Sequence, residues 1–124
     1  MTTARTLVSV VDDDESVRES LPDLLNELGF SVQVFSSAEE FLGSDFVGLT
    51  KCLILDIAMP GMSGLELQEE LKLRRSRIPI VFITAQKDDE IRPALIQRGA
   101  VECLFKPFSD TSLLSAVNAA LRVA

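Results

Sequence analysis

The sequence contains no histidine, no tryptophan and no tyrosine among its 124 residues. Without histidine, the chain has no Ser-His-Asp or Cys-His catalytic arrangement, no His-ligated zinc and no phosphohistidine of its own. Without tryptophan and tyrosine, its core must be built from aliphatic side chains and the seven phenylalanines. Carboxylates, hydroxyls, lysines and the backbone are the groups that remain for chemistry.

Basic residues are also scarce, since 12 Lys and Arg stand against 19 Asp and Glu and give a formal net charge of −7. This acidic balance argues against direct nucleic-acid binding, because contacts with a phosphate backbone need a basic face. The chain is 47% hydrophobic and 25% charged, which is enough for a buried core. We therefore expect residues 1–124 to form one ordered domain.

Cysteine is limited to Cys52 and Cys103, and both lie within apolar runs, so we expect two buried free thiols. The first apolar run, Leu7–Val11, is too short for the core of a signal peptide or for a membrane span, and acidic residues follow it. A cytoplasmic location without membrane association is the expectation that this pattern favours.

Short apolar runs alternate with amphipathic segments along the chain. Four of the five runs are too short and too continuously apolar for strands with one exposed face, and are typical of parallel strands covered on both faces. The five runs are Leu7–Val11, Val32–Phe35, Cys52–Leu55, Ile80–Ile83 and Val101–Phe105.

The segment between the first two runs has the spacing of a helix. From Val17 to Leu28, apolar residues recur at i, i+4, i+7, i+8 and i+11, which lie on one helical face. Gly29 follows and is expected to end the helix. Pro22 lies inside the pattern and removes one backbone hydrogen bond, so we expect it to kink the helix or to move its start.

Four more helices are expected further along the chain. Ser37 and Glu40 have the spacing of a capping box. Asp88 and Asp89 are expected to cap a helix that Gly99 ends. Capping residues and apolar spacing together predict helices over 37–42, 63–73, 88–98 and 110–123.

A strand–helix order repeated five times predicts a doubly wound α/β sheet with helices on both faces, because crossovers between parallel strands are right-handed. Ligands bind such sheets at the carboxyl ends of the strands. Polar residues follow four of the predicted strands at this edge, namely Asp12–Asp14, Asp56, Thr84 and Lys106. One of the three consecutive acids is expected to cap the next helix, but three exceed that need.

These strand-end residues suit phosphoryl transfer. Clustered carboxylates repel one another, and a cation keeps them ionised at neutral pH. The site offers only a few acidic ligands, Asp12, Asp13 and Asp56, and leaves the remaining coordination positions to water. This arrangement suits Mg²⁺ better than Ca²⁺. Lys106 adds a positive charge and Thr84 a hydroxyl donor. A carboxylate nucleophile at such a site would form an acyl phosphate.

With these residues in place, the sequence resembles the receiver domain of bacterial response regulators. The resemblance rests on Val10–Glu15, Leu55–Gly64, Ile83–Ala85 and Lys106–Phe108, which stand in the family's order and spacing over essentially the whole chain. It is most similar to receivers of the FixJ type. The resemblance implies a single flavodoxin-like or CheY-like receiver domain over residues 1–124, with a five-stranded parallel sheet of order 2-1-3-4-5.

The resemblance also implies a phosphoacceptor and a metal site. Asp56 is the implied acceptor, phosphorylated by a sensor histidine kinase of a two-component system. Asp13 and Asp56 would bind Mg²⁺ directly, or Mn²⁺ in its place, and Asp12 would position the ion through water. The backbone carbonyl of Ala58 would complete the ligands supplied by the protein.

Around the phosphoryl group, the resemblance implies that Thr84 donates a hydrogen bond, that Lys106 forms an ion pair, and that a cis peptide joins Lys106 to Pro107. Phosphorylation would change the surface that binds an output domain or partner protein, and hydrolysis of the aspartyl phosphate would reset it. Homodimers would form through the faces of the fourth and fifth helices. A stand-alone receiver and an excised one both fit the sequence.

Two positions depart from the family pattern. Pro22 is one, and it is expected to perturb the first helix near a surface that kinases of the family often contact; the other is the place of an aromatic residue. The family pairs the Thr84 position with an aromatic residue three places before the lysine, as its output switch, and here that place holds Cys103. We expect phosphorylation to survive, while the signal is impaired or runs through the loop after Thr84 and the fourth helix. Phe105 is expected to point to the opposite face of the sheet and not to substitute. The apolar flanks of Cys103 disfavour a redox role.

Three other functions compete with this interpretation. A phosphatase of the haloacid-dehalogenase type needs a second acid two residues after its nucleophile, where this chain has Ala58, so we expect no enzyme that turns over external substrates. An interaction module independent of phosphorylation fits Cys103 but not the intact acids, Thr84 and Lys106. A flavin-binding domain needs a phosphate loop after the first strand, where this chain has acids.

Overall fold

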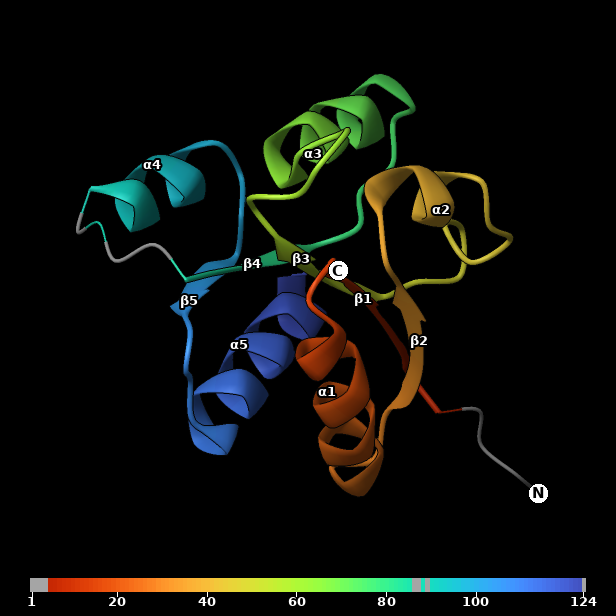
Figure 1. Ribbon diagram of the computed structural model, residues 1–124, viewed down its shortest axis with the longest axis vertical. Helices are drawn as coiled ribbons and strands as arrows, with labels where there is room; N and C mark the ends of the chain where they lie inside the picture. The colour runs from red at the N-terminus through yellow and green to blue at the C-terminus, as the bar shows by residue number, and fades with distance from the viewer. Residues whose placement is uncertain (1–4, 86–87, 89, 124) are drawn as a thin grey trace.

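The computed structural model describes residues 5–85, 88 and 90–123, over which five strands alternate with five helices (Figure 1). The strands are β1 (Leu7–Val11), β2 (Ser31–Phe35), β3 (Cys52–Asp56), β4 (Ile80–Thr84) and β5 (Glu102–Phe105). The helices are α1 (Glu15–Glu27), α2 (Ala38–Leu42), α3 (Gly64–Leu73), α4 (Ile91–Gln97) and α5 (Asp110–Val123). Each strand lies within about one residue of its predicted bounds, the usual uncertainty of element ends.

All five strands are parallel and lie in the order β2-β1-β3-β4-β5, as predicted. The chain passes from β1 to β2 on one side and then returns to β3 on the other, so the strand order reverses between β1 and β3. A reversal of this kind opens a crevice at the carboxyl ends of the two strands. The acidic residues that follow β1 and end β3 are thereby placed next to each other.

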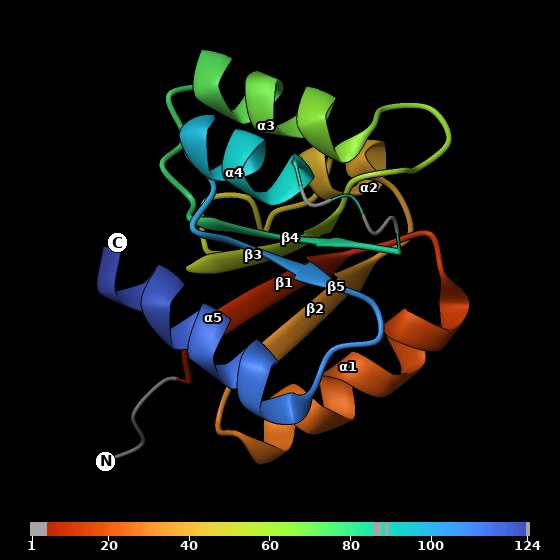
Figure 2. The ribbon, with the colours of Figure 1, turned by 90° about the vertical axis from the view of Figure 1, so that its left-hand side faces the viewer.

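Helices cover both faces of the sheet, α1 and α5 on one side and α2, α3 and α4 on the other (Figure 2). The central strands β1, β3 and β4 are buried almost throughout. The edge strands β2 and β5 keep most of their side chains partly exposed. Helices therefore cover three strands on both faces, whereas the sequence predicts four such strands. Among the described residues, no helix is long and apolar enough to span a bilayer.

Helix α1 begins and ends where its sequence indicates. Asp14 is the N-cap, and its carboxylate accepts a hydrogen bond of 3.0 Å from the N–H of Ser16. Gly29 follows the helix with a φ of 101°, a conformation that glycine adopts without strain. The helix runs through Pro22 from Glu15, so the proline does not move its start.

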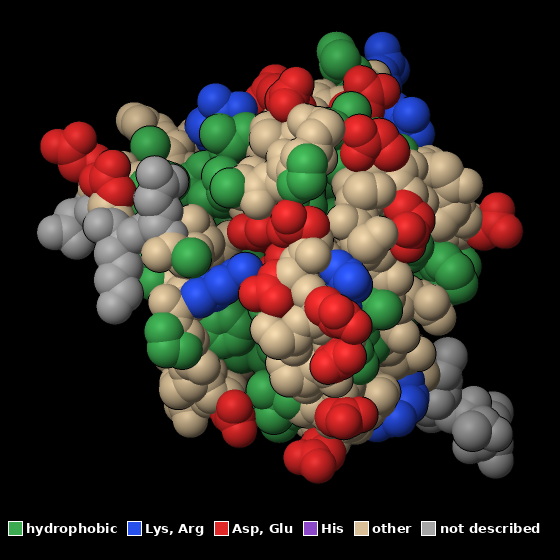
Figure 3. Space-filling view, in the orientation of Figure 1, with side chains coloured by type: hydrophobic (Ala, Val, Ile, Leu, Met, Phe, Trp, Pro, Cys, Tyr) green, Lys and Arg blue, Asp and Glu red, His purple; other side chains and the backbone are tan. Residues whose placement is uncertain are grey.

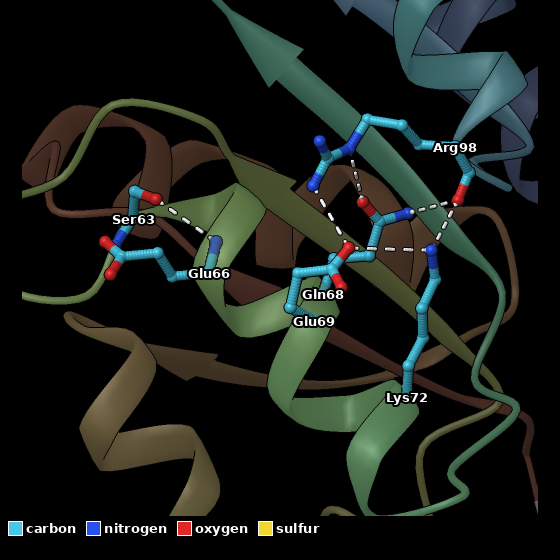
Figure 4. Close-up of polar contacts among 6 residues, drawn as sticks. All are labelled: Ser63, Glu66, Gln68, Glu69, Lys72 and Arg98. Atoms are coloured by element: carbon cyan, nitrogen blue, oxygen red, sulfur yellow. Dashed lines mark hydrogen bonds and ion pairs between the residues drawn. The ribbon is translucent and has the colours of Figure 1, made fainter.

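The other helices differ in small ways from expectation. At α2, Ser37 accepts a hydrogen bond from the N–H of Glu40, but the Glu40 carboxylate accepts one from the Ser36 hydroxyl, so the predicted box is formed only in part. A complete capping box begins α3, between Ser63 and Glu66 (Figure 4).

Helix α4 is shorter than its predicted span of 88–98, since it covers Ile91–Gln97. Asp88 nevertheless stabilises its start, accepting hydrogen bonds from the N–H groups of Glu90 and Ile91. The second predicted cap, Asp89, lies outside the described residues.

Candidate functional site

The predicted site residues meet at the carboxyl edge of the sheet. Asp12 follows β1, Asp56 ends β3, Thr84 ends β4 and Lys106 follows β5. Figure 3 shows acidic side chains gathered near the middle of this face, with basic side chains beside them. Asp12, Asp56 and Thr84 are almost completely buried, whereas Asp13 is exposed, so the cluster is open to solvent on one side.

Three carboxylates of this edge are close enough to share one cation. One oxygen from each of Asp12, Asp13 and Asp56 lies within 4.8 Å of the others. The buried Oδ2 of Asp12 makes no well-aligned hydrogen bond within the described structure. Hard oxygen donors that converge in this way fit a small divalent cation such as Mg²⁺, and the exposed side leaves space for its water ligands.

The backbone around Asp12 is held by three hydrogen bonds. Its N–H donates to the carbonyl of Phe35 at 3.1 Å, and its Oδ1 accepts from the N–H of Asp14 at 2.9 Å. From helix α1, the Arg18 guanidinium donates to the Asp12 carbonyl at 2.9 Å. The Asp12 backbone is therefore fixed by β2 and α1, and its carboxylate is oriented by the N–H of Asp14 in the same loop.

Lys106 supplies the positive charge of the site. Its Nζ lies 2.9 Å from Asp12 Oδ2 and 3.9 Å from Asp56 Oδ1. Its backbone N–H donates to the Thr84 carbonyl at 2.8 Å, and a cis peptide joins it to Pro107. The ammonium group thus stands between the two buried acids, closer to Asp12.

The electrostatics of the site oppose ionisation of Asp56. Burial first, and then the negative charge of Asp12, raise the pKa of the Asp56 carboxyl to about 7, against the opposing effect of Lys106. Burial disfavours the charged form of Lys106, but the adjacent carboxylates of Asp12 and Asp56 outweigh it and raise the pKa of the ammonium group. A cation at this site would favour the ionised form of Asp56.

The loop after β3 is packed directly on the backbone of Asp56, a feature missed in the sequence. The Gly64 N–H donates to the Ile57 carbonyl at 2.9 Å, and a Cβ at Gly64 would collide with the Asp56 carbonyl oxygen. Glu39 of α2 holds the same loop, because its carboxylate accepts from the Met62 N–H at 3.1 Å. Ala58 lies in this loop, and its carbonyl as a metal ligand stays a prediction.

Cys103 is buried in β5, 2% exposed, and is paired in register with Phe82 of β4. Both cysteines are free and buried, as predicted, and burial raises the pKa of the Cys103 thiol to about 11. The expectation for Phe105 was wrong. Side chains two residues apart on a strand share a face, so Phe105 lies on the same side as Cys103, while Leu104 packs on the α1–α5 side.

Comparison with known proteins gives one family. The family model of the response regulator receiver domain matches residues 8–118. Nodulation protein W of Bradyrhizobium diazoefficiens is 45% identical over 94% of this chain and 51% of its own length. FixJ of Azorhizobium caulinodans is 39% identical over 92% of this chain and 54% of its own length. The chain therefore spans about half the length of these curated relatives.

Solved structures agree with the sequence relatives. The response regulator StyR is similar with a TM-score of 0.88 and 47% identity, covering 97% of this chain and 61% of that one. A structure described as FixJ-N has a TM-score of 0.85 and 36% identity, covering 100% of this chain and 98% of that one. Both similarities extend over the strand-end residues described above, because they cover nearly all of the chain.

Proposed function

This chain belongs to the response regulator receiver domain family, and from that premise we propose that it accepts a phosphoryl group on Asp56. The observation that carries the proposal is the position of Asp56. Its carboxylate ends a central strand, lies within 4.8 Å of oxygens of Asp12 and Asp13, and has Lys106 Nζ 3.9 Å away. A nucleophile, a cation site and a fixed positive charge are thereby combined.

In the proposed step, an oxygen of Asp56 attacks the phosphorus of a phosphohistidine on a sensor histidine kinase. A P–O bond forms while the P–N bond breaks, and the leaving imidazole nitrogen keeps the electron pair and takes up a proton from water. The product is an acyl phosphate. Thr84 would donate a hydrogen bond to one phosphoryl oxygen, and Lys106 would pair with another.

The metal requirement follows from the same residues. Asp12, Asp13, Asp56 and the Ala58 carbonyl would hold Mg²⁺, or Mn²⁺, which when bound offsets the negative charge of the phosphoryl oxygens. The three clustered carboxylates and the raised pKa of Asp56 both support a site suited to an added cation. Asp12 would release part of its contact with Lys106, freeing the ammonium group for the phosphoryl group.

Reset would occur by hydrolysis of the acyl phosphate, returning Asp56 and inorganic phosphate. We propose self-catalysed phosphotransfer and dephosphorylation only, because the residue two positions after the nucleophile is Ala58, which offers no acid for external substrates. The other proposed partners are an output domain or partner protein and a second copy bound through the α4–α5 face, all in the cytoplasm. The full-length relatives support this role through their names as regulatory proteins.

Incubation with acetyl phosphate and Mg²⁺, read by intact mass spectrometry, tests the proposal. The wild type should gain one phosphoryl group, and chelation of the cation should prevent the gain. Asp56→Asn should gain none, whereas Asp45→Asn, which changes an exposed acid, should behave as wild type. A folded wild type without an adduct would overturn the proposal and favour an interaction module that works without phosphorylation.

A further inference from the structure

Basic side chains gather where α3 ends, although the chain as a whole carries a formal net charge of −7. Four of the 12 Lys and Arg residues stand within positions 72–77, and no acidic residue lies between Glu70 and Asp88. Arg98, at the end of α4, lies against the same group, since its carbonyl accepts from Lys72 Nζ at 2.8 Å (Figure 4). The basic patch comprises five exposed cations, Lys72, Arg74, Arg75, Arg77 and Arg98.

The acids of α3 balance only part of this charge. Glu69 and Glu70 pair with three cations of the patch at 3.1 to 3.6 Å. Over the part of the chain that the structure describes, Arg75 and Arg77 make no ion pair with an acid. Five cations therefore face two acids, and the surplus positive charge stands at Arg75 and Arg77, where an acidic partner can reach it.

Arg75 occupies a backbone position that favours glycine. Its φ is 58°, in the left-handed region, and the next N–H, that of Ser76, donates to the Leu71 carbonyl at 2.9 Å, as in a Schellman motif. At the same place after α1 and α4 the chain has Gly29 and Gly99, with φ of 101° and 105°. Arginine is strained in this conformation and glycine is not. An arginine that costs strain and pairs with no acid of its own chain is suited to a contact outside it.

A small apolar cavity lies beside these cations. Its volume is about 200 Å³, and its walls include Leu71, Ile78 and Ile80 together with Lys72 and Arg77. Pockets for small molecules usually measure about 300–1,000 Å³, so this one suits a single apolar side chain rather than a free metabolite. The surface thus offers an apolar anchor point with cations at its border.

We propose that the basic patch and this cavity form a docking surface for an acidic segment of a partner protein, one of whose apolar side chains enters the cavity. Charge complementarity favours this occupant, because the net negative charge of the rest of the chain repels such a segment elsewhere. A nucleic acid carries the same sign of charge but has no aliphatic side chain for the cavity. Helices α3 and α4 end at the amino edge of the sheet, opposite the candidate site, so a partner bound here leaves that site open (Figure 2).

Two labelled synthetic peptides, compared by fluorescence anisotropy, test the surface. One carries glutamates on both sides of a single leucine, and the other has serine in place of the leucine. The leucine peptide should bind about tenfold more tightly, because only its side chain fills the cavity. The amide resonances of Ser76, Gly99 and Val101, which line the cavity, should shift when it binds. Equal affinities for the two peptides, or tighter binding of duplex DNA than of the leucine peptide, would overturn the proposal.

Matched variants show whether the unpaired cations carry the binding. Combining Arg75→Gly with Arg77→Gln should weaken binding of the leucine peptide about five- to tenfold. Because glycine relieves the strained backbone at position 75, the thermal midpoint of Arg75→Gly alone should not fall, which separates lost binding from lost folding. Arg122→Gln removes an exposed cation from α5, on the other face of the sheet, and should bind as the wild type does. Full affinity in the double variant, or an equal loss in Arg122→Gln, would contradict the assignment of this surface.

Discussion

The ammonium group of Lys106 lies 2.9 Å from Asp12 Oδ2 and 3.9 Å from Asp56 Oδ1, so it neutralises the more deeply buried acid first. Asp12 is 0% exposed, and an uncompensated charge at such depth is costly. We expect Lys106→Met to lower the free energy of unfolding by about 1–3 kcal/mol, with Mg²⁺ restoring part of the loss. Urea unfolding with and without Mg²⁺ measures this effect.

The control for Lys106 is Arg92→Met, which breaks the partly exposed ion pair between Arg92 Nε and Glu102 Oε1 at 2.6 Å. This change should cost less than about 1 kcal/mol and should not respond to Mg²⁺. Equal losses in the two variants, or a Lys106→Met loss that Mg²⁺ leaves unchanged, would show that Lys106 does not balance a metal-binding acid.

Gly64 is expected to be intolerant of any side chain. A Cβ there would collide with the Asp56 carbonyl oxygen, so Gly64→Ala must displace the backbone that carries the phosphoacceptor. We expect a loss of about 2–4 kcal/mol in the free energy of unfolding and slower phosphorylation by acetyl phosphate. Gly48→Ala is the matched control, because a Cβ at Gly48 meets nothing within 4 Å. Comparable losses in both would contradict the close-packing argument.

The stability of the protein should depend on pH through Asp56, whose pKa is raised from 3.8 to about 7 by burial and by the charge of Asp12. The folded state therefore holds this proton more tightly than the unfolded chain does. The resulting stabilisation is complete below the unfolded pKa and is lost as pH rises through the folded pKa. Asp56→Asn cannot ionise and should become progressively more stable than the wild type as pH rises.

Without divalent cations, we expect this advantage of Asp56→Asn to grow between about pH 4 and about pH 7, to level off above that, and to reach about 1–2 kcal/mol. Solvent at the open side of the site screens Asp56, so the stability difference should stay below the free energy that corresponds to the whole pKa shift. Chemical unfolding at a series of pH values measures the difference. A difference that stays constant over this range would mean that Asp56 titrates as an ordinary exposed acid.

Cys103 should be chemically inert in the folded protein. Its thiol is buried, and burial raises its pKa to about 11, so little thiolate is present near neutral pH. We expect alkylation by iodoacetamide to be slower than in the urea-unfolded chain by about two orders of magnitude or more. Rapid modification of Cys103 under native conditions would reopen a redox role for this position.

Much of the fold is visible in the sequence because parallel strands buried on both faces read as short continuous apolar runs. The site is visible for a related reason, since the carboxyl ends of parallel strands meet at one edge. That rule alone brings Asp12, Asp56, Thr84 and Lys106 together, although they are separated along the chain.

Other features depend on side-chain geometry that spacing does not encode. Nothing in the sequence shows that Lys106 stands closer to Asp12 than to Asp56, or that Glu40 turns to Ser36 instead of completing its box. The hydrogen bonds between Gln68 of α3 and Arg98 at the end of α4 join residues 30 positions apart through long, flexible side chains.

Chemical trapping of the acyl phosphate tests the central claim most directly. Borohydride reduces an aspartyl phosphate to the alcohol, so a phosphorylated aspartate becomes homoserine and can be located by peptide mass spectrometry. After treatment with acetyl phosphate and Mg²⁺, we predict homoserine at position 56 and aspartate retained at Asp12 and Asp13. Homoserine at Asp12 or Asp13, or at no position in a folded and metal-loaded protein, would contradict the assignment of Asp56 as the phosphoacceptor.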